Sequence, residues 1–122
     1  SAWAWAGRDG SHAWTSPMNW TRLWWLLCAH ALTDYVLQSD RMAELKHPTA
    51  GTHNDYGPWW WWMTAHGLIN ALGVLYVTQN VWLSLGEFIV HVALDTAKCQ
   101  RHIDANLDQL GHLWSKCVWA ML

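Results

Sequence analysis

The segment of residues 59–77 constrains the fold most, because it carries no charged side chain over about 19 residues. At 1.5 Å per residue, a helix of that length nearly matches a hydrocarbon core of ~30 Å. The segment begins with four consecutive tryptophans, and tryptophan favours the interface between membrane and water. It therefore predicts a transmembrane helix.

The composition of the whole chain favours the same environment. Charged residues make up 13% of the 122 residues and hydrophobic residues 52%, and 13 residues are tryptophan, whereas globular proteins average about 25% charged residues. The mean hydropathy of -0.05 argues against a membrane, but we give it less weight because the scale scores tryptophan as mildly polar. The net charge of -2 provides no basic surface, which excludes nucleic acid as a partner.

Three further apolar helices are expected, at about residues 20–38, 81–99 and 104–122, with a polar loop at 39–57. We therefore predict an all-α integral membrane bundle of about four transmembrane helices in up-down-up-down order. Residues 18–122 would form this single helical membrane domain. Residues 1–17 would be a Trp-rich leader or a cloning remnant.

Each expected helix carries polar side chains four residues apart, which places them on one helix face. These pairs are His30/Asp34, His66/Asn70, His91/Asp95 and Asp108/His112. Their depth is also shared, because each histidine lies about seven or eight residues from the helix end nearest the loops at 39–57 and 99–104. In an antiparallel bundle this spacing puts all of them ~10–12 Å below the same membrane face. The pattern predicts a single intramembrane cluster.

A divalent metal would balance such a cluster, because buried ionisable groups are costly unless they are paired or bind a metal. Imidazole and carboxylate ligands suit Zn²⁺, Fe²⁺ or Mn²⁺, and bundle cores build such sites from facing helices. The predicted metal ligands are His30, Asp34, His91, Asp95 and His112.

Other polar side chains receive supporting roles. We predict His66 and Asp108 as further ligands or as general acid and base, and Glu87 as a partner of a ligand or a proton relay. Lys98 and Arg101 would bind a phosphate headgroup. Arg41 and Lys46 lie on the same side, and for them ordinary loop charge is an equally good interpretation.

The stretch His30 to Asp40 has the pattern H-x-x-x-D-[aromatic]-x-L-Q-[ST]-D. With the H-x-x-x-D-x-x-K of residues 91–98 and the D-Q-x-x-H of residues 108–112, it resembles an uncharacterised family of small bacterial and bacteriophage membrane proteins. The likeness extends from Leu23 to the C-terminus. It implies a membrane bundle similar to predicted membrane-bound metal-dependent hydrolases, but it supplies no reaction.

The favoured function is therefore a membrane-embedded, metal-dependent hydrolase of a lipid-like ester or phosphoester, in a bacterial inner membrane. Its expected partners are the lipid bilayer, a lipid-like substrate and a larger membrane complex or a homo-oligomer. Two alternatives stay open. The histidines could be axial ligands of haem or another tetrapyrrole, or the chain could be a non-enzymatic accessory subunit whose polar cluster only fixes helix register.

Overall fold

The computed structural model describes residues 18–52 and 54–122, so the predictions for residues 1–17 lie outside the described residues. The long helices are α1 (Trp20–Ala31), α3 (Trp59–Thr78), α4 (Val81–Cys99) and α5 (Ala105–Met121). The shorter elements are the π-helical turn η1 (Leu32–Val36), the helix α2 (Asp40–Leu45) and the 3-10 turn η2 (Pro48–Ala50). No strand occurs in these described ranges, and the all-α prediction is confirmed.

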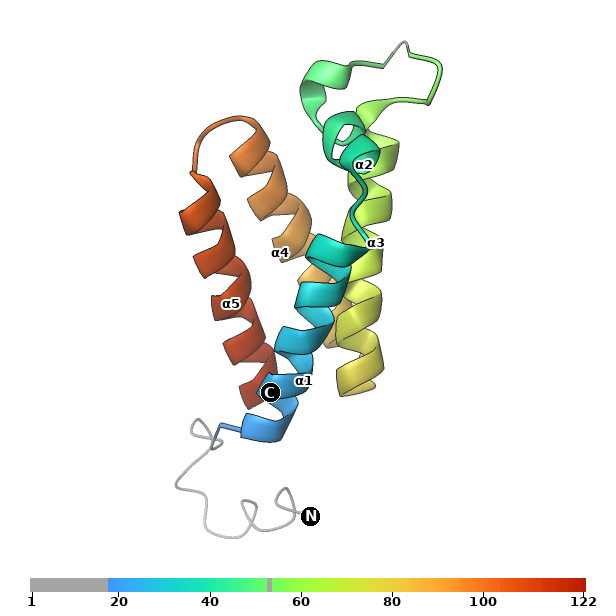
Figure 1. Ribbon diagram of the computed structural model, residues 1–122. Coiled ribbons are helices and arrows are strands. Elements are labelled where there is room, and N and C mark those ends of the chain that lie inside the picture. Colours follow the sequence, from blue (N-terminus) through green and yellow to red (C-terminus); the bar gives the residue numbers. More distant parts are fainter. Residues whose placement is uncertain (1–17, 53) are drawn as a thin grey trace, which may run out of the picture.

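The four long helices run alternately up and down and surround a common interior (Figure 1). Helix α1 packs against α3 and α5, and α4 packs against the same two helices from the other side. This arrangement confirms the predicted helix order. Helix α2, the turn η2 and the loop between α4 and α5 lie together at the upper end in Figure 1.

Side-chain caps fix where the helices begin. The Oδ1 atom of Asn80 accepts hydrogen bonds from the backbone N–H groups of Trp82 and Leu83, at 2.9 and 3.3 Å. Asp104 caps α5 in the same way through the N–H of Leu107. Gln79 ends α3 in the left-handed conformation, with φ 54°, which lets the chain reverse sharply into α4.

The membrane prediction is wrong, because no helix among the described residues is both long enough and apolar enough to cross a membrane. Helix α1 has only 12 residues before the π-helical turn, and the 17 residues of α5 include Asp108 and Lys116. Helix α4 has three charged side chains. Helix α3 has none, but its four tryptophans, His66 and Asn70 lower its hydropathy. The transmembrane bundle and the inner-membrane localisation are both overturned.

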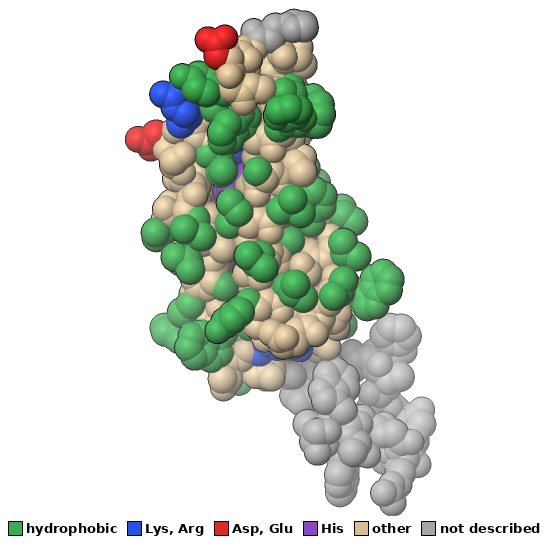
Figure 2. Space-filling model, turned by 90° about the vertical axis from the view of Figure 1, so that its right-hand side faces the viewer, with side chains coloured by type: hydrophobic (Ala, Val, Ile, Leu, Met, Phe, Trp, Pro, Cys, Tyr) green, Lys and Arg blue, Asp and Glu red, His purple; other side chains and the backbone are tan. Residues whose placement is uncertain are grey.

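The buried apolar cluster of the described residues is small, and Met63 and Ala71 are buried outside it on α3. Leu26, Val74, Leu83 and Ala120 form the cluster near the beginnings of α1 and α4, with Trp119 packed against it. Figure 2 shows many hydrophobic side chains spread along the outside of the bundle, with charged side chains mainly near its ends. The middle of the bundle is filled instead by polar side chains.

Candidate metal centre

Four buried histidines meet in the interior, one from each long helix. His66, His91 and His112 have no exposed surface, and His30 is 5% exposed. The ring centroid of His91 lies 4.9 Å from that of His66 and 4.4 Å from that of His112. The ring centroids of His30 and His112 are 5.3 Å apart. The i, i+4 spacing and the shared depth therefore bring the imidazoles into direct contact.

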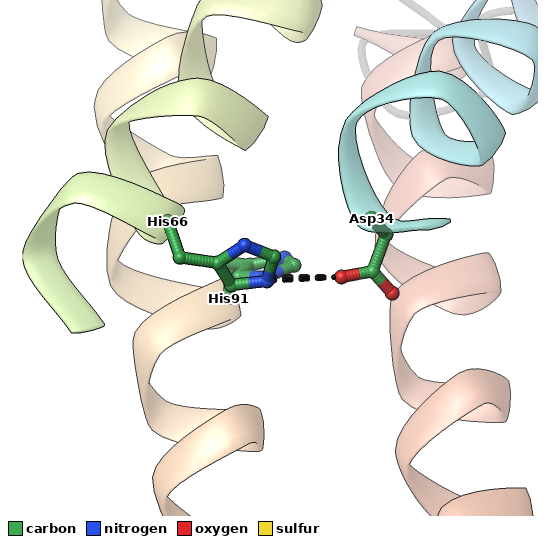
Figure 3. A group of neighbouring side chains, drawn as sticks. All are labelled: Asp34, His66 and His91. Atoms are coloured by element: carbon green, nitrogen blue, oxygen red, sulfur yellow. Dashed lines mark hydrogen bonds and ion pairs between the residues drawn. The ribbon is translucent and has the colours of Figure 1, made fainter. Parts of the chain in front are cut away.

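Asp34 joins α1 to the histidines of α3 and α4. Its Oδ1 atom lies 3.1 Å from Nε2 of His66 and 3.5 Å from Nε2 of His91 (Figure 3). Asp34 belongs to the π-helical turn, in which the N–H of Leu37 donates to the carbonyl of Leu32 five residues earlier. Such a turn shifts the helix face by one residue, and π turns occur frequently at functional sites.

Asp95 and Asp108 approach the same histidines from the upper side. Oδ2 of Asp95 lies 3.3 Å from Nε2 of His66, and its Oδ1 lies 3.8 Å from Nε2 of His112. Oδ1 of Asp108 lies 3.2 Å from Nε2 of His112. Each of the three carboxylates therefore lies within 3.3 Å of at least one imidazole nitrogen.

The cluster offers more than one set of donor atoms that could hold a metal ion. Three groups of residues have ligand atoms within 4.8 Å of one another: Asp34/His66/His91, Glu87/His91/His112 and Asp95/Asp108/His112. The groups overlap through His91 and His112. The donors are nitrogen and carboxylate oxygen, a set that suits Zn²⁺, Fe²⁺ or Mn²⁺.

Within the part of the chain that the structure describes, several buried polar atoms of the cluster make no hydrogen bond of good geometry, although some of them lie 3.2 to 3.8 Å from one another. These atoms are Nδ1 of His30, His66, His91 and His112, Nε2 of His91 and His112, Oδ1 of Asp95 and Oδ1 of Asp108. Buried polar atoms in native proteins are almost always satisfied, and each exception costs about 1–3 kcal/mol. A bound cation would satisfy those that face one another.

The charge states of the carboxylates and of His91 suit a cation, whereas Asp34 and Asp95 outweigh burial and raise the pKa of His66, whose proton a metal would have to displace. Burial alone would raise the pKa values of Asp34 and Asp95, but the surrounding imidazoles, and for Asp95 also Lys46, outweigh burial and hold both pKa values well below their usual range. Burial lowers the pKa of His91. At His112, Asp108 and Asp95 outweigh burial and raise the pKa to about 9. Ionised carboxylates beside a neutral imidazole are the forms that bind metals.

A basic pocket of about 250 Å³ adjoins the cluster at the upper end. It is lined by Gln38, Ala43, Lys46, His47, Lys98, Cys99 and Arg101. Nζ of Lys46 contacts Oδ2 of Asp95, and Nζ of Lys98 lies 3.3 Å from Oδ1 of Asp95 and 3.1 Å from Oδ2 of Asp108. Two ammonium groups therefore separate the pocket from the carboxylates.

Glu87 lies one turn deeper than the cluster. Its Oε1 atom lies 3.6 Å from Nδ1 of His91 and 2.6 Å from Nζ of Lys116, and its Oε2 accepts a hydrogen bond from the indole of Trp119 at 2.7 Å. Glu87 thus faces the ring nitrogen of His91 that points away from Asp34. A carboxylate in this place fixes the tautomer and orientation of a metal-binding imidazole.

The structure brings nearly all the predicted site residues together. His30, His66, His91, His112, Asp34, Asp95 and Asp108 form the cluster, Glu87 lies beneath it, and Lys98 and Arg101 line the pocket. His30 stands at the edge, where its Nε2 meets the side-chain oxygen of Gln109 at 3.3 Å. Arg41 lies apart, over the ring of Tyr56. The roles of the cluster and pocket residues as ligands or catalysts stay predictions.

Sequence reasoning missed the burial of two lysines in the interior. Lys46, which fitted ordinary loop charge equally well, is only 4% exposed and contacts Asp95. Lys116 received no role, although it continues the spacing of Asp108 and His112 by another four residues and is 2% exposed. That spacing was the signal for Lys116. No pattern in the neighbouring sequence predicts the burial of Lys46, because its partner Asp95 lies on α4, far along the chain.

These features define the chain as an all-helical bundle with a buried centre of imidazoles and carboxylates. A family model described as "Protein of unknown function (DUF3307)" matches residues 23–121, and the chain belongs to this family. The resemblance to an uncharacterised family is thereby confirmed, whereas the match does not establish a membrane location, a bacterial source or the motif. No curated protein and no solved structure matches the chain.

Proposed function

We propose that the protein is a hydrolase that uses a divalent metal ion, held in the buried cluster, to cleave an ester or phosphoester. The observation that carries the proposal is that Nε2 of His91 and seven other buried imidazole and carboxylate atoms lack hydrogen-bond partners among the described residues, while ligand atoms of Asp34, His66 and His91 lie within 4.8 Å of one another. A purely structural polar core would leave few such atoms. The lipid-like substrate expected from the sequence depended on the membrane assignment, whereas hydrolysis at this centre does not.

The geometry favours Asp34, His66 and His91 as the primary ligands. Oδ1 of Asp34 lies 3.1 Å and 3.5 Å from the two Nε2 atoms, and Oδ2 of Asp95 lies 3.3 Å from Nε2 of His66. The ligands come from η1, α3 and α4. His66, for which a role in acid–base catalysis was also open, is thereby proposed as a ligand.

His112 and Asp108 are proposed as the acid–base pair. Asp108 lies 3.2 Å from Nε2 of His112 and also contacts Lys98, which lines the pocket. A carboxylate beside an imidazole sets its pKa and orientation for proton transfer. A divalent cation would supply polarisation of the scissile bond and activation of water.

The tetrapyrrole alternative stays a prediction, and the packing of the imidazoles weighs against it. A macrocycle with axial histidines needs a flat space between its ligands, but ring centroids 4.4 to 5.3 Å apart leave the histidines in mutual contact. An optical spectrum of the purified protein tests this alternative, because a Soret band would support it.

The proposed metal centre is tested by elemental analysis and by metal titration of the metal-stripped protein. We expect the wild type to bind Zn²⁺ or Mn²⁺ stoichiometrically and to hydrolyse p-nitrophenyl phosphate or p-nitrophenyl acetate only when metal is present. Asp34→Asn and His91→Gln should each weaken metal binding at least about tenfold, with the helical circular dichroism retained.

His102→Gln is the matched control, because His102 is exposed in the loop between α4 and α5, and we expect it to bind metal like the wild type. A metal-free wild type that also gains no metal on titration would contradict the proposal. If His91→Gln then unfolded the bundle, the cluster would be a device for helix register, as the accessory-subunit hypothesis states.

A further inference from the structure

The basic pocket has the size and charge of a site for a small anion. Its volume of about 250 Å³ is below the range of about 300–1,000 Å³ that drug-sized ligands occupy. Lys46, His47, Lys98 and Arg101 supply basic side chains from the polar loop, α4 and the turn that follows it, while Gln38 adds an amide. Among the described residues no carboxylate lines the pocket itself, and Asp95 and Asp108 lie behind the ammonium groups of Lys46 and Lys98.

The two lysines of this pocket are held by the same carboxylate that faces the histidines. Lys46 contacts Oδ2 of Asp95, and Lys98 lies 3.3 Å from Oδ1 of that side chain. Oδ2 of Asp95 also lies 3.3 Å from Nε2 of His66. A metal ion reaching Asp95 would therefore compete with both ammonium groups for the same two oxygens.

The charges near Asp95 also require a compensating anion once a metal binds. Asp95 and Asp108 face the ammonium groups of Lys46 and Lys98, and a divalent cation would add two positive charges to a buried volume. Lys46 is nearly buried, so it cannot leave to solvent cheaply. A dianion in the adjoining pocket could form ion pairs with the ammonium groups of Lys46 and Lys98 after the metal displaces them. A phosphate monoester carries two negative charges and suits this role.

We propose that the pocket binds the phosphate group of the substrate, and that Lys46 and Lys98 transfer from Asp95 and Asp108 to that phosphate when the metal binds. Metal and phosphate would then bind cooperatively, and the coupling would be the same in both directions. The proposal rests on the proposed metal centre and narrows its substrate to phosphoesters. A neutral carboxylic ester has no negative charge with which the ammonium groups of Lys46 and Lys98 could pair.

The coupling is measured by calorimetric titration of Mn²⁺ into metal-stripped protein, with and without 1 mM glycerol 3-phosphate as the probe. We expect glycerol 3-phosphate to tighten Mn²⁺ binding by about tenfold in the wild type, within the usual range of coupling between sites. Inorganic phosphate should tighten it similarly. A short-chain phosphatidic acid tested beside them shows whether a lipid-borne phosphate is also accepted, and coupling to any of the three supports the proposal.

Lys46→Gln is the decisive variant. Without the competing ammonium, Mn²⁺ should bind more tightly in the absence of phosphate, and the effect of phosphate should fall below about twofold. Lys46→Arg, which keeps the charge, should retain most of the coupling. Arg41→Gln is the matched control, because Arg41 lies on the same short helix but stacks over Tyr56 outside the pocket, and it should couple like the wild type.

The outcomes separate the two proposals. If Mn²⁺ binds but its affinity is unchanged by every phosphate compound, the phosphate site is overturned and the metal centre stands. If phosphate still tightens Mn²⁺ binding in Lys46→Gln as it does in the wild type, the proposed transfer of Lys46 from Asp95 to the phosphate is overturned. If neither Mn²⁺ nor Zn²⁺ binds the wild type, both proposals fail together.

Discussion

At the scale of single residues, the buried pair of Glu87 and Lys116 is the most demanding feature of the bundle. Both side chains are at most 2% exposed, and Nζ of Lys116 lies 2.6 Å from Oε1 of Glu87. The indole of Trp119 and the hydroxyl of Ser115 donate to the other oxygen at 2.7 and 3.5 Å. A buried ion pair satisfied in this way is tolerated, but removal of one partner leaves an uncompensated charge.

We therefore expect Lys116→Met to lower the free energy of unfolding by about 3 kcal/mol, because Glu87 would remain buried without its cation. The double variant Glu87→Gln/Lys116→Met should lose clearly less than the sum of the two single variants. Urea unfolding of the four proteins measures this coupling. Additive losses would show that the pair is not coupled.

The same variant should change the response to acid. Burial alone would raise the pKa of Glu87, but His91, Lys116 and Trp119 outweigh burial and lower it from 4.5 to about 2. A lowered folded-state pKa contributes stability that is fully present above pH 4.5 and is lost as the pH falls towards 2. Without the Lys116 cation the folded-state pKa of Glu87 should lie closer to 4.5, so Lys116→Met should lose less stability than the wild type as the pH falls below 4.5. Unfolding of metal-free protein from pH 6 to pH 3 measures it.

At the scale of elements, the close approach of α3 and α4 brings His66 and His91 within reach of one another. Gly67, the neighbour of His66, permits this approach, because a Cβ atom there would lie 2.7 Å from Cγ2 of Val92 and 3.1 Å from the ring of Phe88. Val92 is branched at Cβ and has little rotamer freedom with which to yield. The helix spacing at the proposed metal centre therefore depends on Gly67, which has no side chain to bind a ligand.

We expect Gly67→Ala to lower the free energy of unfolding by about 1–3 kcal/mol through overpacking and to weaken metal binding by displacing His66. Gly111→Ala on α5 is the control, because its Cβ would meet only the flexible end of Leu94, at 2.9 Å. The gain in helix propensity of up to about 1 kcal/mol should offset that contact. Equal effects of the two variants on unfolding and on metal titration would contradict the argument.

At the scale of the whole molecule, the distribution of polar and apolar side chains leaves little apolar core. Among the described residues the buried apolar cluster has four members, and Met63 and Ala71 are buried outside it. Large hydrophobic side chains such as Trp24, Tyr76, Trp82 and Trp114 are mostly exposed. The interior is held by ion pairs and hydrogen bonds instead. Stability of the bundle should therefore depend on whatever neutralises its carboxylates.

A metal that binds only the folded chain should stabilise it by about 2.7 kcal/mol at a free concentration one hundred times its dissociation constant. For a domain of this size we expect a rise in Tm of about 10 °C. Differential scanning calorimetry with Zn²⁺ or Mn²⁺, and again after a chelator is added, measures it. His91→Gln should show less than half the rise, and an unchanged Tm in the wild type would contradict a folded-state metal site.

Local patterns in the sequence predict the long helices, their order and their polar faces, because the i, i+4 spacing of His30/Asp34, His91/Asp95 and Asp108/His112 is a local property of the helix. The same local view led to the wrong environment. The uncharged segment at 59–77 suggested a membrane span, yet its tryptophans, His66 and Asn70 leave it too polar to be one.

Only the tertiary structure decided which residues meet across helices. Three contacts show this: Asp34 with His66, Lys46 with Asp95, and Lys116 with Glu87. In each of them the two residues are at least 29 positions apart in the sequence. The π-helical turn that directs Asp34 toward His66 is local, but its effect depends on the helix that packs against it. Such contacts depend on how four helices pack, and local periodicity carries no information about the partner across the interface.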